Sequence, residues 1–160
     1  MQTRATLFED LSVVCGFAVD ADELYYSFPK AKFPLTVDQV LPNFNGRLGN
    51  TSVICDGKVV AFANYISVLP NDSVTVGNVL VDPSFRGKGV GRFLIEYMEN
   101  FAIRNFEARL CKIPCFNRNT SGLLFYHALG YRPIDGEPRV DFQNSPVYLV
   151  HLAKALKATV

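Results

Sequence analysis

The sequence predicts a mixed α/β (α+β) fold with a central sheet of about six to seven strands, flanked by helices, in which one central strand is bulged. Three observations lead to this prediction: a hairpin signal in the first half, a strand–loop–helix–strand order in the second half, and a valine-rich run whose alternation changes phase. At 160 residues the chain is long enough for one domain with a sizeable core, so we expect a single domain over residues 1–160.

The first half begins with a short strand near residues 3–8 and continues with helical segments to about residue 44. Residues 20–28 place three carboxylates beside three aromatic side chains. They are either a helix that Asp20 caps, with its aromatic residues facing the core, or a surface that attracts a cationic amine. Strands follow at 51–55 and 59–68, and the Asp56-Gly57 pair between them is a strong two-residue hairpin signal.

The next strand, over residues 73–81, changes its phase in the middle. Val74 and Val76 share one phase of the alternation, whereas Val79 and Val81 lie on the other. One extra residue at Gly77-Asn78, a β-bulge, accounts for the slip. Because a bulge splays a strand from its neighbour, it leaves backbone amides free to bind a ligand. The alternative is a strand buried on both faces, which is also valine-rich.

A glycine-rich loop follows the strand and leads directly into a helix over residues 90–104. Unpaired amides at the helix start and the positive end of its dipole favour an anion, and Arg86 and Lys88 have the right charge. We therefore predict a diphosphate site; the alternative is a tight turn with solvated basic residues. The loop reads Arg86-Gly87-Lys88-Gly89-Val90-Gly91.

Two common phosphate loops do not match. A nucleoside-triphosphate loop requires Ser or Thr after its lysine, where this chain has Gly89, and a dinucleotide loop requires GxGxxG instead of GxGxG. The pattern R/Q-x-x-G-x-G/A of the GNAT superfamily of N-acetyltransferases is matched by Arg86, Gly89 and Gly91. In that family this loop holds the pyrophosphate of acetyl-coenzyme A. The resemblance implies a cofactor-binding set of Val79, Leu80, Val81, Arg86, Gly87, Lys88, Gly89, Val90, Gly91, Arg92, Asn119 and Tyr126.

A second motif resembles the same family. Asn119, Gly122, Tyr126, Gly130 and Tyr131 match its N-x-x-A-x-x-x-Y-x-x-x-G-F/Y spacing, with glycine in place of the usual alanine. Asn119 can cap a helix over residues 120–128 that Gly130 ends. By resemblance the asparagine binds the pantetheine region, and Tyr126 is the catalytic general acid that protonates the departing thiolate. The alternative for Tyr126 is an ordinary core aromatic.

Strands near 109–113, 131–134 and 147–152 complete the sheet. A formal net charge of +1 argues against a nucleic-acid surface, and the chain shows no signal peptide or apolar run long enough for a membrane span. We expect a cytoplasmic protein with reduced thiols. Its four cysteines lack metal-ligand spacing, so no metal is predicted. Cys115 is either a reactive thiol near the coenzyme or a packing residue.

The resemblance implies an acetyl-CoA-dependent N-acetyltransferase in which a primary amine of a small molecule or amino-acid derivative attacks the acetyl carbon directly. The amide of Leu80 or Val81 would stabilise the oxyanion. No carboxylate lies in residues 73–81, so the general base stays unassigned, with Asp72 and Asp82 as candidates.

Two alternatives remain. One is a protein N-terminal or lysine acetyltransferase, because residues 78–83 resemble the ribosomal-protein alanine acetyltransferases of the family. The other is a non-catalytic acyl-CoA-binding module. Many family members dimerise through their terminal strands, so a homodimer is a candidate assembly. The sequence does not decide the acceptor, the acyl chain length or the oligomeric state.

Overall fold

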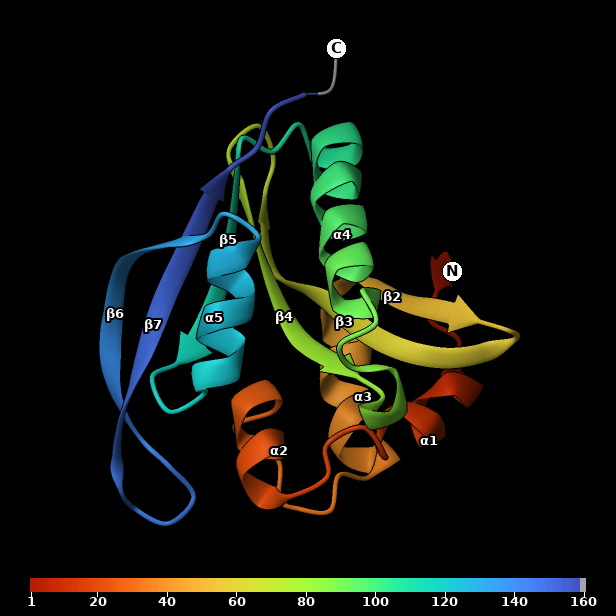
Figure 1. The fold of residues 1–160 in the computed structure, drawn as a ribbon, viewed down its shortest axis with the longest axis vertical. Helices are drawn as coiled ribbons and strands as arrows, with labels where there is room; N and C mark the ends of the chain where they lie inside the picture. Colours follow the sequence, from red (N-terminus) through yellow and green to blue (C-terminus); the bar gives the residue numbers. More distant parts are fainter. Residues whose placement is uncertain (159–160) are drawn as a thin grey trace.

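The fold is built on one mixed β-sheet of seven strands covered by helices on both faces, seen here in a computed structural model that describes residues 1–158 (Figure 1). The strands are β1 (Gln2–Ala5), β2 (Leu48–Cys55), β3 (Lys58–Leu69), β4 (Ser73–Val81), β5 (Leu110–Phe116), β6 (Arg132–Val140) and β7 (Pro146–Ala155). The helices are α1 (Leu11–Val14), α2 (Ala21–Ser27), α3 (Val37–Gly46), α4 (Val90–Phe106) and α5 (Thr120–Ala128), with 3₁₀ turns at Phe8–Asp10 and Pro83–Phe85.

The strand order in the sheet is β1-β2-β3-β4-β5-β7-β6, and only the β4–β5 pair is parallel. Helices α4 and α5 cover one face, where the main apolar core includes Leu94 and Met98. Helices α1, α2 and α3 cover the other face over a second core that includes Leu11 and Phe62 (Figure 1). The predicted mixed sheet with flanking helices is confirmed. None of the helices in residues 1–158 has the length and hydropathy to span a membrane.

The hairpin between β2 and β3 turns at Asp56 and Gly57, as predicted. Both residues have positive φ, 50° and 78°, which is the backbone of the two-residue turn that asparagine or aspartate followed by glycine favours. This turn sets the pairing of the two long strands that support the rest of the sheet.

The bulge in β4 lies where the valine pattern predicts it. Phe62 pairs with Leu80 and Asn64 pairs with Gly77, so β4 uses three steps where β3 uses two. Asn78 takes the extra position with a φ of 50°. As a consequence, the valines before and after the slip all pack toward the α4 face, although their spacing in the sequence places them on opposite phases: Val74, Val76, Val79 and Val81.

Beyond its first residues, β4 separates from β5. The two strands pair only from Ser73 with Leu110 to Thr75 with Lys112. From there β4 continues along β3 and β5 continues along β7, so the strands diverge below the helices (Figure 1). This divergence leaves one side of the second half of β4 without a neighbouring strand.

Several predicted bounds differ from the structure, and two of these differences have a clear cause. The strand expected at residues 3–8 ends at Ala5, because Asp10 accepts the Leu7 amide at 2.8 Å and the Arg4 guanidinium at 2.6 Å and 3.0 Å, which folds the chain into a 3₁₀ turn. The strand expected at 131–134 extends to Val140, because it pairs with β7 along most of its length at the edge of the sheet.

Candidate active site

The glycine loop presents free backbone amides to open space. Gly87 and Gly89 have φ values of 72° and 83°, and a Cβ atom built on either would meet no atom within 4 Å. Helix α4 begins at Val90, and within residues 1–158 the amides of residues 87–92 donate no hydrogen bond to other residues. Free amides at the start of a long helix, beside space that side chains would fill, fit a diphosphate group.

Gly91 serves a different purpose from the other two glycines. A Cβ atom there would lie 3.0 Å from Phe125 Cζ and 3.7 Å from Val81 Cγ2. The loop, helix α5 and the end of β4 therefore meet at this residue. Close packing requires the glycine here, whereas left-handed backbone requires the glycines at 87 and 89.

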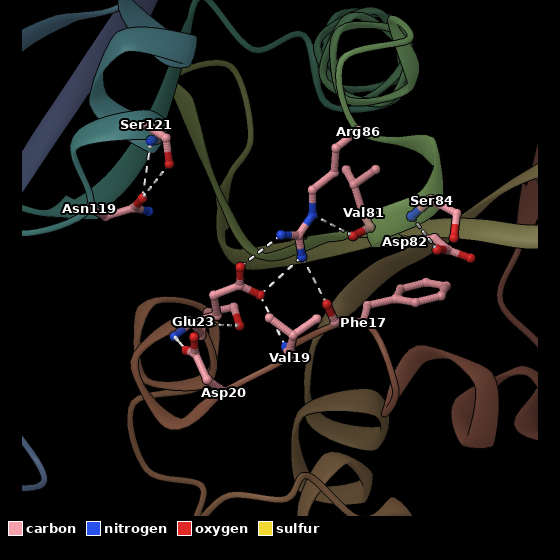
Figure 2. A network of polar contacts seen from close by, with 12 residues as sticks. Phe17, Val19, Asp20, Glu23, Val81, Asp82, Ser84, Arg86, Asn119 and Ser121 are labelled. Carbon is pink, nitrogen blue, oxygen red and sulfur yellow. Dashed lines mark hydrogen bonds and ion pairs between the residues drawn. The ribbon is translucent and has the colours of Figure 1, made fainter.

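The guanidinium of Arg86 is occupied by protein groups. Its two terminal nitrogens donate to the Glu23 carboxylate at 2.7 Å and 3.0 Å, and Nη2 also donates to the Phe17 carbonyl at 2.9 Å. Nε donates to the Val81 carbonyl at 3.2 Å (Figure 2). Arg86 thus connects the loop to α2 and to β4. Lys88 forms no ion pair within residues 1–158, and its Nζ lies 5.4 Å from the centre of the Phe85 ring, so its positive charge is available beside the amides.

Of the two interpretations of residues 20–28, the structure shows the capped helix, α2. Asp20 accepts the Glu23 amide at 2.9 Å, and the Tyr25 and Phe28 side chains are buried. The pairing of Glu23 with Arg86 was not predicted, because the two residues lie 63 positions apart in the chain. Hydrogen bonding from the Arg86 guanidinium lowers the pKa of the Glu23 carboxyl.

Replacing Glu23 with glutamine is expected to lower Tm slightly at pH 7, by about 2–4 °C or less, because both side chains are partly exposed. A carboxyl whose folded pKa is lowered stabilises the fold above its unfolded value of about 4.3 and loses that contribution as the pH falls through the folded pKa. The Tm difference between wild type and Glu23→Gln should therefore shrink toward zero below about pH 4 in thermal melts. The exposed pair of Glu96 with Arg92 provides the control, since Glu96→Gln should change Tm at neither pH. A difference independent of pH would contradict this account.

The backbone of β4 points one amide away from its partner strand. The Asp82 amide donates to the Val60 carbonyl at 2.8 Å, and the antiparallel register pairs Ala61 with Val81 and Phe62 with Leu80. Because bonded pairs alternate along an antiparallel ladder, the Leu80 amide faces β3 and the Val81 amide faces the side from which β5 has separated. The Val81 carbonyl faces the same side, where it accepts Arg86.

Tyr126 lies on α5 with its ring in the core and its hydroxyl without a partner in residues 1–158. The residue is 7% exposed, and its ring packs against Phe125 and Tyr131 with centroids 5.1 Å and 6.1 Å away. Burial raises the pKa of its phenol above the ordinary value. The group is therefore protonated throughout the neutral range, as a proton donor must be.

Asn119 caps α5 through its side chain. Its Oδ1 accepts the Gly122 amide at 3.0 Å and lies 3.4 Å from the Ser121 hydroxyl (Figure 2). A Cβ atom at residue 122 would lie 2.4 Å from Asn119 Nδ2, so glycine at that position leaves room for the cap. The backbone carbonyl oxygen of Asn119 also lies 3.9 Å from the Cys115 sulfur.

The comparisons with known proteins agree with this arrangement. The model of the acetyltransferase (GNAT) domain matches residues 49–133, which is more than half of the chain. The chain belongs to the GNAT acetyltransferase family. N-acetyltransferase is the enzyme class of this family, and acetyl-CoA is its co-substrate.

Individual relatives are more distant. The chain is 27% identical over 100 residues to the alanine N-acetyltransferase of ribosomal protein bS18 from Salmonella typhimurium, a match that covers 62% of this chain and 65% of that protein. The structure of the ribosomal-protein-S18-alanine N-acetyltransferase from Escherichia coli superposes with a TM-score of 0.73 at 18% identity, covering 99% and 96% of the two chains. That of yncA from Salmonella typhimurium with its cofactor acetyl-CoA gives 0.74 at 18% identity, covering 100% and 96%.

Within residues 1–158, neither of the two candidate general bases is a free carboxylate. Asp82 accepts the Ser84 amide at 2.8 Å, and Asp72 accepts the Ser73 hydroxyl at 2.9 Å, so both act in turns. Burial raises the pKa of the Cys115 thiol to about 12, which makes it a packing residue and not a reactive thiol. Within residues 1–158 no three or more potential ligands from His, Cys, Asp and Glu are grouped to hold a metal ion.

One polar cluster at the bulge was not predicted. The Asn78 side-chain oxygen accepts hydrogen bonds from Asn43 at 3.1 Å, Arg47 at 2.7 Å and Asn64 at 3.0 Å. The side-chain nitrogen of Asn78, Nδ2, donates to the Ser27 carbonyl at 2.7 Å. These residues come from four segments of the chain, so no spacing in the sequence could bring them together.

Proposed function

We propose that the chain is an acetyl-CoA-dependent N-acetyltransferase that transfers an acetyl group to the primary amine of a small molecule or amino-acid derivative by direct attack. One observation carries the proposal. Free loop amides, the outward amide of Val81 and the unpartnered hydroxyl of Tyr126 come from three elements that meet at Gly91. Family membership supplies the activity that this arrangement fits.

In this proposal each group has a separate task. The amides of residues 87–92, with Lys88, hold the diphosphate, and Asn119 lies beside the pantetheine arm. The Val81 amide donates to the acetyl oxygen as negative charge develops there. Bound acetyl-CoA supplies the thioester. As the acceptor nitrogen forms the new bond to the acetyl carbon, the carbon–sulfur bond breaks, and Tyr126 gives its proton to the sulfur.

Arg86 takes a supporting part in the proposed site. Its side-chain donors are used by Glu23, Phe17 and Val81, so it positions the loop against α2 and β4. The proton of the acceptor amine has no assigned carboxylate. An amine that arrives neutral can attack without a base, because its lone pair is already free. The proton that its nitrogen then loses passes through solvent to the Tyr126 phenolate, so the net reaction moves one proton from nitrogen to sulfur.

A protein acceptor is the second candidate. It is favoured by the match to the alanine N-acetyltransferase of ribosomal protein bS18, a relative named for a protein substrate. The match covers 65% of that relative, and the family model begins only at residue 49.

The test is a calorimetric titration of the protein with acetyl-CoA and, as a control, with NAD, together with thiol release over a panel of small amines and peptides. We expect binding of acetyl-CoA in the micromolar range, no binding of NAD, and thiol release with small amines. Release with peptides alone would favour the protein acceptor. Binding without release on any acceptor would favour a non-catalytic acyl-CoA-binding module, and no binding of acetyl-CoA would contradict the proposal.

A further inference from the structure

Arg47 is a half-buried cation beside the bulge, on the face of the sheet opposite α4 and α5. It lies between α3 and β2, and its Nη1 donates to Asn78 Oδ1 at 2.7 Å and to Asn64 Oδ1 at 3.3 Å. Nη1 would also lie 3.2 Å from a Cβ atom at Gly77, so the guanidinium packs directly on the bulged backbone. Arg47 is therefore held by the strand that carries the proposed oxyanion donor.

The other edge of the guanidinium is free. Nε and Nη2 donate to no residue in 1–158, and no carboxylate of that part of the chain lies within 4.0 Å of Arg47. The neighbouring groups that face it are neutral amides. Burial without a countercharge lowers the pKa of Arg47, which contrasts with Arg4 and Arg86, whose carboxylate partners raise theirs.

Arg47 also lines a pocket of about 340 Å³. Its wall contains Arg47 and Lys30 as charged groups, has no carboxylate, and is completed by apolar side chains such as Phe28 and Pro42. The Gln39 side chain is hydrogen-bonded to the backbone of Lys32 and Pro34 at 2.6 Å, 3.0 Å and 3.1 Å. It therefore holds the wall of the pocket in place and adds no negative charge to it. A volume of about 340 Å³ lies within the range of small-molecule sites.

We infer that this pocket binds an oxyanion of the acceptor, so that the acceptor is a small primary amine carrying a carboxylate or phosphate, held by the free edge of Arg47 with Lys30 beside it. This inference rests on the proposed function. A planar guanidinium with two parallel donors matches both oxyanions. Because Asn78 joins Arg47 to the bulge, an anion bound there places its attached amine beside the strand where the acetyl group lies in the proposed site.

The experiment compares acceptors whose amine is accompanied by a carboxylate, a neutral amide or a phosphate: L-amino acids, their α-amides, and phosphoethanolamine. For each we would measure kcat/KM by thiol release, and also equilibrium binding by calorimetry in the presence of coenzyme A and in its absence. The wild type should prefer either the amino acids or phosphoethanolamine over the amides by about 10- to 100-fold, the range of a charge-assisted hydrogen-bonded pair. Which one is preferred identifies the oxyanion.

Variants separate this role from a structural one. Arg47→Gln should raise KM for the anionic acceptors by about 10- to 100-fold while leaving kcat/KM for the amides and the affinity for acetyl-CoA within a few-fold. Arg47→Lys should recover part of the loss. Since Lys30 is exposed and makes no side-chain hydrogen bond in residues 1–158, Lys30→Ala should fold normally and still weaken the anionic acceptors, whereas Lys58→Ala in the β2–β3 hairpin should not.

The binding measurements keep this inference separate from the proposed function. Anionic acceptors that bind in preference to their amides without thiol release would support the pocket and contradict the enzyme. Equal use or equal binding of acids and amides, an Arg47→Gln loss that is the same for both, or acetylation of peptides in preference to every free anionic amine would overturn the inference.

Discussion

Replacing Tyr126 with phenylalanine is expected to lower kcat by about 100-fold or more while coenzyme affinity and thermal stability stay close to those of the wild type. The hydroxyl makes no hydrogen bond within residues 1–158, so the fold loses no contact when it is removed. The ring keeps its packing on Phe125 and Tyr131. What is lost is the proton for the departing sulfur, which matters only in the transition state.

Tyr131 provides a matched control in the same aromatic cluster. Its hydroxyl donates to the buried Glu99 carboxylate at 2.8 Å, and Lys154 donates to that carboxylate at 3.0 Å. Tyr131→Phe should therefore cost about 1–3 kcal/mol of stability and leave kcat unchanged. The two variants should show opposite patterns, and equal effects on kcat would remove Tyr126 from the reaction.

The pH dependence of the rate provides a second test of Tyr126 as the proton donor. Since burial raises the pKa of its phenol, the proton donor is present at every pH up to at least about 10. The rate should rise with pH as the acceptor amine loses its proton and should show no descending limb below pH 10. A decline centred near pH 7–8 would point to another donor.

Local chemistry is what made most of the fold predictable. The turn at Asp56-Gly57, the helix over residues 120–128 between Asn119 and Gly130, and the phase slip in β4 each depend on residues close together in the sequence. The structure reproduces all three.

Contacts between segments that lie far apart in the chain could not be predicted from the sequence. The motif spacing identifies Arg86 as a loop residue. Only the packing of α2 against the loop shows that the Glu23 carboxylate pairs with the Arg86 guanidinium. The choice between the Leu80 and Val81 amides depends on the β3–β4 register, and the Arg47 cluster depends on four segments meeting at Asn78.

Val81→Pro is expected to lower kcat by about 100- to 1,000-fold, the loss seen when one donor to a developing oxyanion is removed. Proline deletes an amide that faces away from β3, so no bond of the β3–β4 ladder is lost. Its fixed φ lies within the extended region, and Leu80 before it is already extended, as a residue preceding proline must be. The carbonyl that accepts Arg86 remains.

Two further variants decide whether the effect comes from this amide. Val81→Ala keeps the amide and shortens the side chain, so it should lose some stability and little of kcat. Leu80→Pro deletes an amide that bonds to β3 and should destabilise the protein strongly, as proline does inside a sheet. The decisive result is a folded Val81→Pro protein, with Tm near that of Val81→Ala, that binds acetyl-CoA and transfers the acetyl group poorly. If its kcat matches that of Val81→Ala, the oxyanion is stabilised elsewhere, and the free side of β4 only shapes the cleft between β4 and β5.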